Sequence, residues 1–253
     1  MIIENKNLII SGIGKGIGRD MFIKSLEISR FTIGIVRDKK DFQSINTLVK
    51  KKNKTNFKLF LGDIKNQFLI DNILKYLYKN KILINGLINN SGERQRKKFL
   101  QITDRDLKKI FENNFFSHFY FIQKLIRYFK KNRNGIFSIV NVGSIVGVNG
   151  FAQLSGYAAT KSALEALTKC LASEFANENI KVNIIHPGFI KTSYFKNFKK
   201  NKKKLYNWTL SRIPQKRWGD PADVTNLAMF LISDKSNYIN GQSIVCDGGW
   251  VSS

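Results

Sequence analysis

The hydrophobic positions of this chain form short apolar runs that alternate with longer stretches of mixed polar and apolar residues. Short runs of this kind are typical of strands buried on both faces, and the mixed stretches are typical of helices packed against them. The alternation predicts one α/β domain, residues 1–253, with a parallel sheet covered by helices on both faces. The pattern predicts strands at residues 7–11, 31–36, 58–63, 83–89, 135–144 and 181–186, and helices ending near residue 29 and spanning residues 71–79, 106–128 and 157–176.

The first predicted strand passes directly into a glycine-rich loop that precedes the first predicted helix. The loop carries Gly12, Gly16 and Gly18, with Lys15 and Ile17 between them. Glycines let the backbone turn tightly and approach a pyrophosphate, whose charge is held by the N–H groups at the start of the next helix. The loop therefore indicates a Rossmann-type, doubly wound dinucleotide fold, although an ordinary glycine-rich turn would look the same if it stood alone.

The end of the second predicted strand bears on the choice of dinucleotide. Arg37 follows this strand, where a dinucleotide fold presents the adenosine ribose. An acid there would bind the 2′-hydroxyl, whereas a base would bind a 2′-phosphate. Lys15 adds a second cation, and Asp38 favours the opposite choice. We expect NADP(H) rather than NAD(H), with Asp63, at the end of the third strand, beside the adenine ring.

Tyr157 and Lys161 are spaced so that they share one face of a helix. A cation beside a phenol favours the phenolate and lowers its pKa towards the range in which it exchanges a proton with a substrate. The same spacing occurs by chance on many helices. The pair therefore indicates catalysis only in combination with other motifs.

Several motifs in fixed order resemble the short-chain dehydrogenase/reductase family of NAD(P)-dependent oxidoreductases. Residues 11–18 match the family's Ser-Gly-x-x-x-Gly-Ile-Gly loop, residues 89–92 are similar to its Asn-Asn-Ala-Gly element, and residues 157–161 match its active-site signature. The resemblance covers nearly the whole chain. It implies two further catalytic residues, Asn114, with Asn113 as the alternative, and Ser144, thirteen residues before Tyr157.

The resemblance also implies a role for each catalytic residue. Tyr157 would donate a proton to a carbonyl oxygen that Ser144 hydrogen-bonds. Lys161 would stabilise the phenolate and bind the nicotinamide ribose, while Asn114 would hold a water that connects Lys161 to solvent. Residues 193–216 would form a substrate lid, and residues 217–249 would help to build a homotetramer or dimer. The expected cofactor-binding residues are Gly12, Lys15, Gly16, Ile17, Gly18, Arg37, Asp63, Ile64, Asn90, Gly92, Tyr157, Lys161, Pro187, Gly188, Ile190 and Thr192.

The chain carries 43 Lys and Arg against 18 Asp and Glu, which gives a formal net charge of +25. Charge of this size attracts polyanions. The lysines are scattered, however, and Lys, Asn, Ile and Phe are abundant together, so drift towards A/T-rich codons explains the charge better than a nucleic-acid surface does. The dense run at residues 196–204 needs its own explanation.

Other classes of protein find little support in the sequence. Cys170, Cys246, His118 and His186 show no metal-ligand spacing, so we expect no metal site and two reduced, half-buried cysteines. The N-terminal residues lack the pattern of a signal peptide, and no segment reaches the length of a membrane span. We therefore expect a cytoplasmic protein.

The overall pattern is most similar to the 3-oxoacyl-[acyl-carrier-protein] reductases, which implies reversible interconversion of a carbonyl and a secondary alcohol. Acyl carrier protein is acidic, and the basic residues 94–98 and 196–204 are candidates for docking it. Glu93 stands where the family often has a small apolar residue, so the sequence does not decide which substrate the pocket accepts. The alternatives are a sugar, polyol or other alcohol dehydrogenase, a nucleic-acid-binding protein on an inactive reductase fold, and a dinucleotide sensor.

Overall fold

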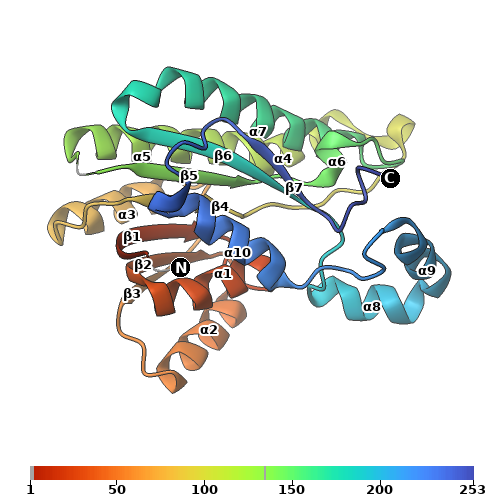
Figure 1. Cartoon of the computed structure of the whole chain (residues 1–253), viewed down its shortest axis with the longest axis horizontal. Helices are drawn as coiled ribbons and strands as arrows, with labels where there is room; N and C mark the ends of the chain where they lie inside the picture. The colour runs from red at the N-terminus through yellow and green to blue at the C-terminus, as the bar shows by residue number, and fades with distance from the viewer. Residues whose placement is uncertain (1–2, 134) are drawn as a thin grey trace.

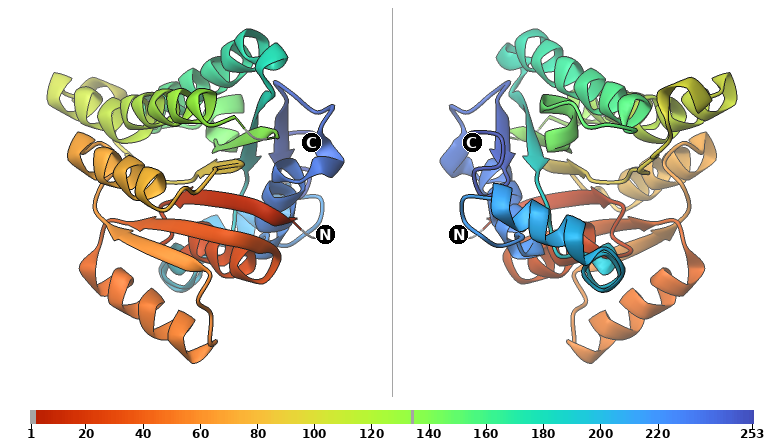
Figure 2. Two further views of the ribbon diagram at one scale, coloured as in Figure 1. Left: turned by 90° about the vertical axis from the view of Figure 1, so that its left-hand side faces the viewer. Right: turned by 90° about the vertical axis from the view of Figure 1, so that its right-hand side faces the viewer.

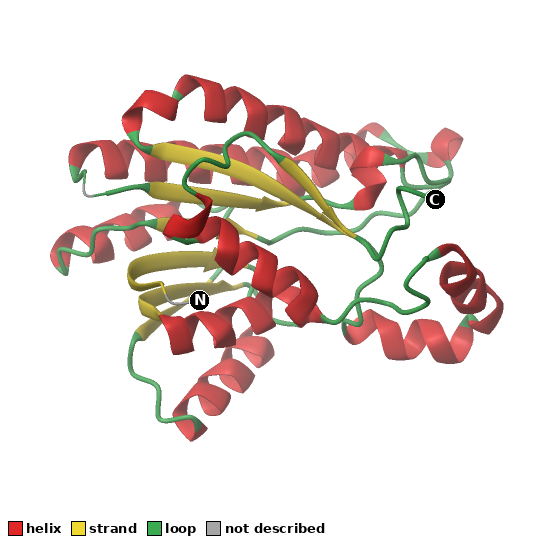
Figure 3. Ribbon diagram, viewed as in Figure 1, coloured by secondary structure: helices red, strands yellow, loops and turns green. Residues whose placement is uncertain are grey.

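One parallel sheet forms the centre of the computed structural model, which describes residues 3–133 and 135–253, except for the side chains at positions 4, 193, 194, 196 and 197. Within that part of the chain the sheet has seven strands in the order β3-β2-β1-β4-β5-β6-β7 (Figures 1 and 3). Both faces are covered, as the uninterrupted apolar runs predicted. The strands are β1 (Ile3–Ser11), β2 (Ser29–Val36), β3 (Phe57–Leu61), β4 (Gly86–Asn89), β5 (Phe137–Val142), β6 (Ile180–Pro187) and β7 (Ser243–Cys246).

Two layers of helices enclose the sheet (Figure 2). Leu8 and Ile10 of β1 pack into the core beneath α1, α2 and α10, whereas Ile9 packs into the core beneath α3, α5 and α7. Successive side chains of a strand point to opposite faces, so one strand supplies both cores. The predicted doubly wound α/β fold is confirmed. The helices are α1 (Gly16–Ile28), α2 (Lys39–Lys51), α3 (Gln67–Lys79), α4 (Asp104–Phe111), α5 (Ser117–Lys131), α6 (Ile145–Val148), α7 (Ser155–Glu174), α8 (Ser193–Asn201), α9 (Lys203–Arg212) and α10 (Pro221–Ile232), with short helical turns at Phe99–Gln101, Glu112–Phe116, Ala176–Glu178 and Asp234–Ser236.

The order of strands reverses between β1 and β4. From β1 the chain moves outwards through β2 to β3 on one side, and from β4 through β5 and β6 to β7 on the other. Ser11 and Asn89, the last residues of β1 and β4, are paired in register. The loops that follow them diverge, and doubly wound sheets bind their ligands in the crevice that this divergence opens.

Three local features differ from the prediction. Residues 39–51, where polar side chains outnumber apolar ones, form α2, which the apolar pattern did not predict. The predicted helix at 106–128 is divided into α4 and α5 by a π-helical turn at Glu112–Phe116. Cys170 is exposed, not half-buried, because it lies away from the face of α7 that packs on the sheet.

The segment predicted as a lid, residues 193–216, contains the helices α8 and α9, which stand beyond the end of the sheet (Figure 1). Their aromatic residues join Trp218 and Trp250 in a separate apolar cluster. No helix in the described part of the chain is long and apolar enough to cross a membrane.

Candidate active site

The glycine loop has the shape required by the pyrophosphate of a dinucleotide. Gly12 has φ +71°, and a Cβ atom on Gly18 would lie 2.2 Å from the carbonyl oxygen of Gly12. Backbone therefore occupies space that a side chain would need. Helix α1 begins at Gly16, and its N-cap residue, Lys15, provides no side-chain hydrogen bond to the helix. The first N–H groups of α1 thus lack a side-chain cap and can bind an anion.

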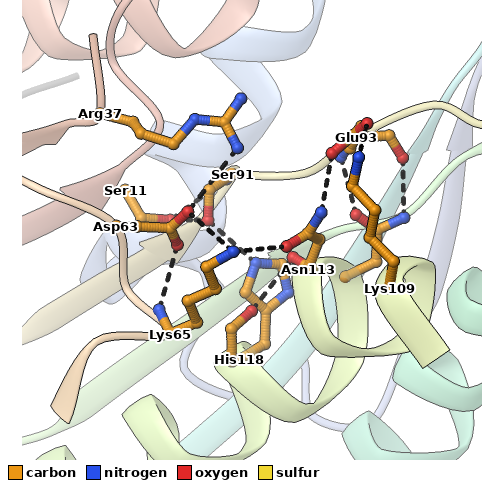
Figure 4. Close-up of polar contacts among 11 residues, drawn as sticks. Ser11, Arg37, Asp63, Lys65, Ser91, Glu93, Lys109, Asn113 and His118 are labelled. Carbon is orange, nitrogen blue, oxygen red and sulfur yellow. Dashed lines mark hydrogen bonds and ion pairs between the residues drawn. The ribbon is translucent and has the colours of Figure 1, made fainter. Parts of the chain in front are cut away.

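A chain of buried polar groups fastens this loop to the end of β4. The hydroxyl oxygen of Ser11 accepts hydrogen bonds from the backbone N–H groups of Asn90 (3.1 Å) and Ser91 (3.2 Å), and the Asn90 side chain donates to the carbonyl of Gly12 at 3.0 Å. The Ser91 hydroxyl lies 3.1 Å from Nε2 of His118 (Figure 4). Burial, reinforced by the charge of Lys161, lowers the pKa of His118 to about 3. His118 is therefore a neutral structural partner of the loop.

A cavity of about 470 Å³ extends from the glycine loop along the ends of β2 and β3. Arg37 lies 3.6 Å from the carboxylate of Asp63, and Lys15 lies 3.6 Å from that of Asp41 (Figure 4 shows the Arg37 pair). Asp38 also lines this cavity, but its carboxylate accepts from the backbone N–H groups at the start of α2 at 2.8 and 3.0 Å. The carboxylate of Asp38, which favoured a ribose 2′-hydroxyl over a 2′-phosphate, is therefore occupied as the N-cap of α2.

Tyr157 and Lys161 lie on the buried side of α7. The Lys161 ammonium donates to the carbonyl of Val142 at 2.7 Å and lies 5.9 Å from the centre of the Tyr157 ring. Burial lowers the pKa of Lys161 to about 8. Burial also raises the pKa of Tyr157, against a hydrogen bond with Ser144 and the charge of Arg94, which lower it. In this structure burial outweighs both influences and favours the neutral phenol, the form that can donate a proton, and the role of Lys161 in stabilising the phenolate stays a prediction.

Ser144 caps the short helix α6 after β5. Its hydroxyl accepts from the N–H of Val146 at 3.2 Å, and its own N–H lies 3.2 Å from Nδ1 of His186. The other ring nitrogen of His186 lies 3.3 Å from a carboxylate oxygen of Glu165 on α7, and burial lowers the pKa of His186. Nδ1 of His186 lies 3.0 Å from the Ser144 carbonyl as well, so a neutral imidazole bonds the Ser144 backbone in either tautomer, donating to the carbonyl or accepting from the N–H. His186 therefore helps to hold Ser144 in place.

The π-helical turn between α4 and α5 turns two consecutive asparagines inwards. Asn114 binds the backbone of Glu93, accepting from its N–H at 2.7 Å and donating to its carbonyl at 2.8 Å, and it also donates to the Thr160 hydroxyl at 3.3 Å. Asn113 instead donates to the Glu93 carboxylate at 2.7 Å (Figure 4). Asn114 thus contacts α7, the helix that carries Tyr157 and Lys161, and its role in holding a water stays a prediction.

A second cavity, of about 840 Å³, opens beside Tyr157 and Ser144. The turn after β6 forms one side of it, and this turn is packed so closely that a Cβ on Gly188 would lie 2.6 Å from the Cβ of Asp247. Apolar and aromatic side chains also line this cavity. These are Ile145, Val146, Phe151, Leu154, Phe189, Phe198, Leu205, Trp208 and Trp218.

The two cavities bring together most of the residues expected from the sequence. The larger is lined by Ile17, Asn90, Gly92, Ser144, Tyr157, Lys161, Pro187, Gly188, Ile190 and Thr192. The smaller is lined by Gly12, Lys15, Arg37, Asp63, Ile64, Asn90 and Gly92.

The remaining expected residues, Gly16 and Gly18, shape the glycine loop without lining either cavity. The Asn114 side chain holds the backbone of Glu93, in the loop after β4. The sequence predicted no role for His118 or His186, although His186 is a polar residue at the end of a largely apolar strand, which was the available signal. No group of His, Cys, Asp and Glu suited to a metal ion occurs among the residues that the structure describes.

Comparison with known proteins places this geometry in context. A family model described as enoyl-(acyl carrier protein) reductase matches residues 9–251. A 3-oxoacyl-[acyl-carrier-protein] reductase of Buchnera aphidicola subsp. Schizaphis graminum is 34% identical over 98% of both chains. A 2-dehydro-3-deoxy-D-gluconate 5-dehydrogenase of Escherichia coli is 28% identical over 98% of this chain and 96% of its own. A solved structure of a 4-hydroxyisoleucine dehydrogenase complexed with NADH is 29% identical, with a TM-score of 0.87 over 98% of this chain and 100% of that one.

Proposed function

This chain belongs to the short-chain dehydrogenase/reductase family of NAD(P)-dependent oxidoreductases acting on CH–OH groups, and we propose that it reduces the keto group of a 3-oxoacyl thioester. The observation that carries the proposal is the set of apolar and aromatic side chains that line the 840 Å³ cavity together with Tyr157 and Ser144. An acyl chain can remove this surface from water, at roughly 25 cal/mol per Å² of apolar area. A polyhydroxylated sugar would leave its own hydroxyls unpaired against the same surface.

The catalytic residues supply position and a proton. A bound nicotinamide dinucleotide would supply the hydride. The neutral phenol of Tyr157 would give its proton to the carbonyl oxygen, and the hydroxyl of Ser144, already hydrogen-bonded to that phenol, would stabilise the oxygen as its charge grows. Lys161, with a pKa of about 8, would then favour the phenolate that remains and assist its return to the phenol.

We propose NADP(H) as the preferred cofactor. Arg37 and Lys15 line the smaller cavity, and Asp38 is occupied by capping α2. A 2′-phosphate has to displace Arg37 from Asp63 and Lys15 from Asp41. Both ion pairs are 3.6 Å long, and both cations are 64% exposed. Such surface pairs contribute about 0–1 kcal/mol, whereas an arginine can bind a phosphate through two charge-assisted hydrogen bonds.

Dehydrogenation of a sugar or polyol is the second candidate. It draws on the similarity to the 2-dehydro-3-deoxy-D-gluconate 5-dehydrogenase, which extends over nearly the whole chain. The lining of the larger cavity favours the acyl substrate. The two candidates differ in the polarity of the group beside the reacting carbonyl, which makes them separable by assay.

We further propose that the protein acts in the cytoplasm on substrates carried by an acidic acyl carrier protein. We also propose that it assembles as a homotetramer or dimer. Arg94 and Arg96 line the larger cavity, as do Phe198 of α8 and Leu205 of α9, two helices rich in lysine, so basic residues of both segments would complement an acidic partner. Leu107, Phe116 and Tyr120 expose 37–45% of their surface on α4, the π-turn and α5, a patch that a second copy would cover. The free thiols of the chain are consistent with a reducing compartment.

The test of the proposed function is oxidation of NADPH and NADH by the purified protein with a panel of carbonyl compounds. The panel contains acetoacetyl thioesters of N-acetylcysteamine and of acyl carrier protein, 2-keto-3-deoxy sugar acids and cyclic ketones. We expect the thioesters to give the highest kcat/KM. Preference for a sugar acid would support the second candidate, and salt-dependent DNA binding without turnover of any carbonyl would replace both.

A further inference from the structure

Trp250 contacts three aromatic residues of the larger cavity without lining the cavity itself. Its side chain is buried, and its ring lies 6.1 Å from that of Phe151, 4.9 Å from that of Phe189 and 5.5 Å from that of Trp208, measured between ring centres. These three residues line the cavity and come from three separate segments of the chain. One buried ring thus connects three parts of the cavity's lining.

Two of these contacts come from segments attached to the sheet. Phe151 follows the short helix α6, and Phe189 lies in the turn after β6. The backbone around Trp250 is fixed as well, because the carboxylate of Asp247 accepts from the N–H groups of the residues before and after Trp250, each at 2.8 Å. Trp250 is therefore held in place by the body of the fold.

The third contact comes from the segment proposed as the lid, residues 193–216. Trp208 is part of α9, and Arg212, the last residue of this helix, places its guanidinium 5.6 Å from the centre of the Trp208 ring and 5.3 Å from that of Trp250. A cation at this distance attracts both rings. The Ser253 hydroxyl also donates to the carbonyl of Arg212 at 3.2 Å, so the end of α9 and residues 250–253 lie side by side (Figure 1).

A different face of α9 is attached to Trp218. The Tyr206 ring lies 5.7 Å from that of Trp218, and the Trp218 indole N–H donates to the Thr209 hydroxyl at 2.8 Å. Loss of the Trp250 ring would therefore leave α9 attached through this face. It would release the face that carries Trp208.

We propose that Trp250 is a positioning residue for the substrate: it holds Trp208 against the larger cavity, and this contact sets the affinity for long apolar substrates. The inference rests on the proposed reduction of 3-oxoacyl thioesters and adds a residue that does not touch the substrate. Arg212 supports the same contact from the lid. When Trp208 is not held, a long acyl chain removes less apolar surface from water, whereas a short one depends on this ring less.

The kinetic test compares 3-oxoacyl thioesters of N-acetylcysteamine with four-carbon and eight-carbon acyl groups. Trp250→Leu should raise KM for the longer substrate by about 3- to 10-fold, the size of one aromatic pair, and leave kcat and the KM for NADPH nearly unchanged. Trp250→Phe, which keeps a ring, should restore most of the affinity. An equal rise of KM for both thioesters, or no rise for either, would overturn the proposal.

A second variant covers the case in which Trp250→Leu fails to fold. Arg212 is exposed, so Arg212→Gln leaves the core intact. It should raise KM for the eight-carbon substrate by about 2- to 5-fold, the size of an exposed cation–π contact. An unchanged KM in this variant would contradict the role of Arg212.

A double-mutant cycle tests whether Trp250 acts through Trp208. In the Trp208→Ala background, Trp250→Leu should change KM for the eight-carbon substrate little further, because two residues that act through one contact are not additive. Fully additive effects would show that Trp250 acts by another route and would overturn the proposal.

Two measurements keep this inference distinct from the proposed function, because neither requires turnover. Hydrogen exchange followed by mass spectrometry should be faster for the backbone amides of α9 in Trp250→Leu and Arg212→Gln than in the wild type, and unchanged for those of α1. Calorimetric titration with octanoyl-N-acetylcysteamine, which lacks the keto group, should give a Kd raised by the same factors as KM. If the protein reduces no thioester, these two results would still support positioning by Trp250. Unchanged exchange in α9, or a Kd that does not differ from that of the wild type, would refute it.

Discussion

The two cavities along the crevice are built by different means. The smaller cavity, at the cofactor end, is bordered by the glycine loop, whose backbone is so closely packed that a Cβ on Gly18 would lie 2.2 Å from a carbonyl oxygen and 2.3 Å from the side chain of Asn90. At the substrate end the surface consists of side chains from distant parts of the chain, among them Phe151, Trp208 and Trp218. The glycine positions of this loop tolerate almost no substitution. The substrate end can change its shape and polarity one side chain at a time.

This difference explains why the cofactor class is easier to infer than the substrate. A loop packed this closely requires glycine at fixed spacings, because glycine adopts the φ of +71° at Gly12 without strain and has no Cβ to collide with the backbone at Gly18. A side-chain-lined site has no such spacing requirement. Its specificity depends on which residues the lid and the loop at residues 93–96 bring into contact.

The largest effect is expected where the two ends meet, at Tyr157. Tyr157→Phe should lower kcat by a factor of about 10²–10⁴, because it removes the proton donor, while the dissociation constant of the cofactor stays nearly unchanged. Steady-state kinetics and fluorescence titration with NADPH measure the two quantities. Tyr238→Phe, at a fully exposed position, is the matched control. A near-normal kcat in Tyr157→Phe would contradict the assignment of Tyr157 as the proton donor.

Gly18→Ala tests the backbone-built end. The added methyl group would meet the Gly12 carbonyl and the Asn90 side chain, so the loop has to move, and displacements of about 1 Å can cost ~10² in a positioned site. We expect NADPH affinity to fall by about that factor, measured by titration alongside the Tm. Gly150→Ala, where nothing lies within 4 Å of the new Cβ, should bind normally. Similar affinities in both variants would mean that the loop does not hold the cofactor.

The same contrast between backbone and side-chain surfaces decides how much of the fold and of the site the sequence could predict. The alternation of apolar runs predicted the sheet and its two helical layers, since buried parallel strands require such runs. The glycine spacing and the Tyr157/Lys161 pair pointed to residues that the fold indeed brings to one crevice. The amphipathic helix α2 was missed because its few apolar residues lie among nine polar ones.

What could not be predicted depends on contacts between distant segments. His118 and His186 looked isolated, yet each meets a partner from another loop, Ser91 and Ser144 respectively. The cation expected to lower the pKa of Tyr157 was Lys161, but burial outweighs every such influence. The balance between desolvation and charge is a property of the packed structure, and spacing along one helix does not reveal it.

Arg37→Asp tests a side chain of the smaller cavity. There we expect this side chain, and not the backbone, to distinguish NADPH from NADH. Loss of charge-assisted hydrogen bonds to a 2′-phosphate should lower kcat/KM for NADPH by about 10- to 100-fold and change that for NADH much less. Arg30→Asp, near the other end of β2, is the control. Equal effects on NADPH and NADH in Arg37→Asp would show that Arg37 is a solvated surface residue.

Trp208→Ala tests the side-chain-built end. Trp208 lines the larger cavity and is 46% exposed, so its loss should raise KM for longer 3-oxoacyl thioesters by about 10-fold, less than the full burial of such a side chain would give. The KM for NADPH should stay the same. Kinetics with C4 and C8 thioesters measure the effect. A rise in both KM values would indicate that the two ends are not independent.

The smallest expected effect concerns pH and Lys161, which lies between the two ends. Its pKa is about 8 in the folded protein, against an ordinary lysine value of 10.5, so between these values the unfolded chain binds more protons and the free energy of unfolding rises with pH. Urea denaturation at pH 7.5 and 9.5 measures the rise. Lys181, whose pKa is also lowered to about 8, contributes with the same sign. Lys161→Met should therefore show a smaller rise than the wild type. If the free energy of unfolding rose equally in the wild type and in Lys161→Met, the Lys161 ammonium would not be desolvated. Lys161 would then stay fully protonated throughout the pH range in which Tyr157 recovers its proton.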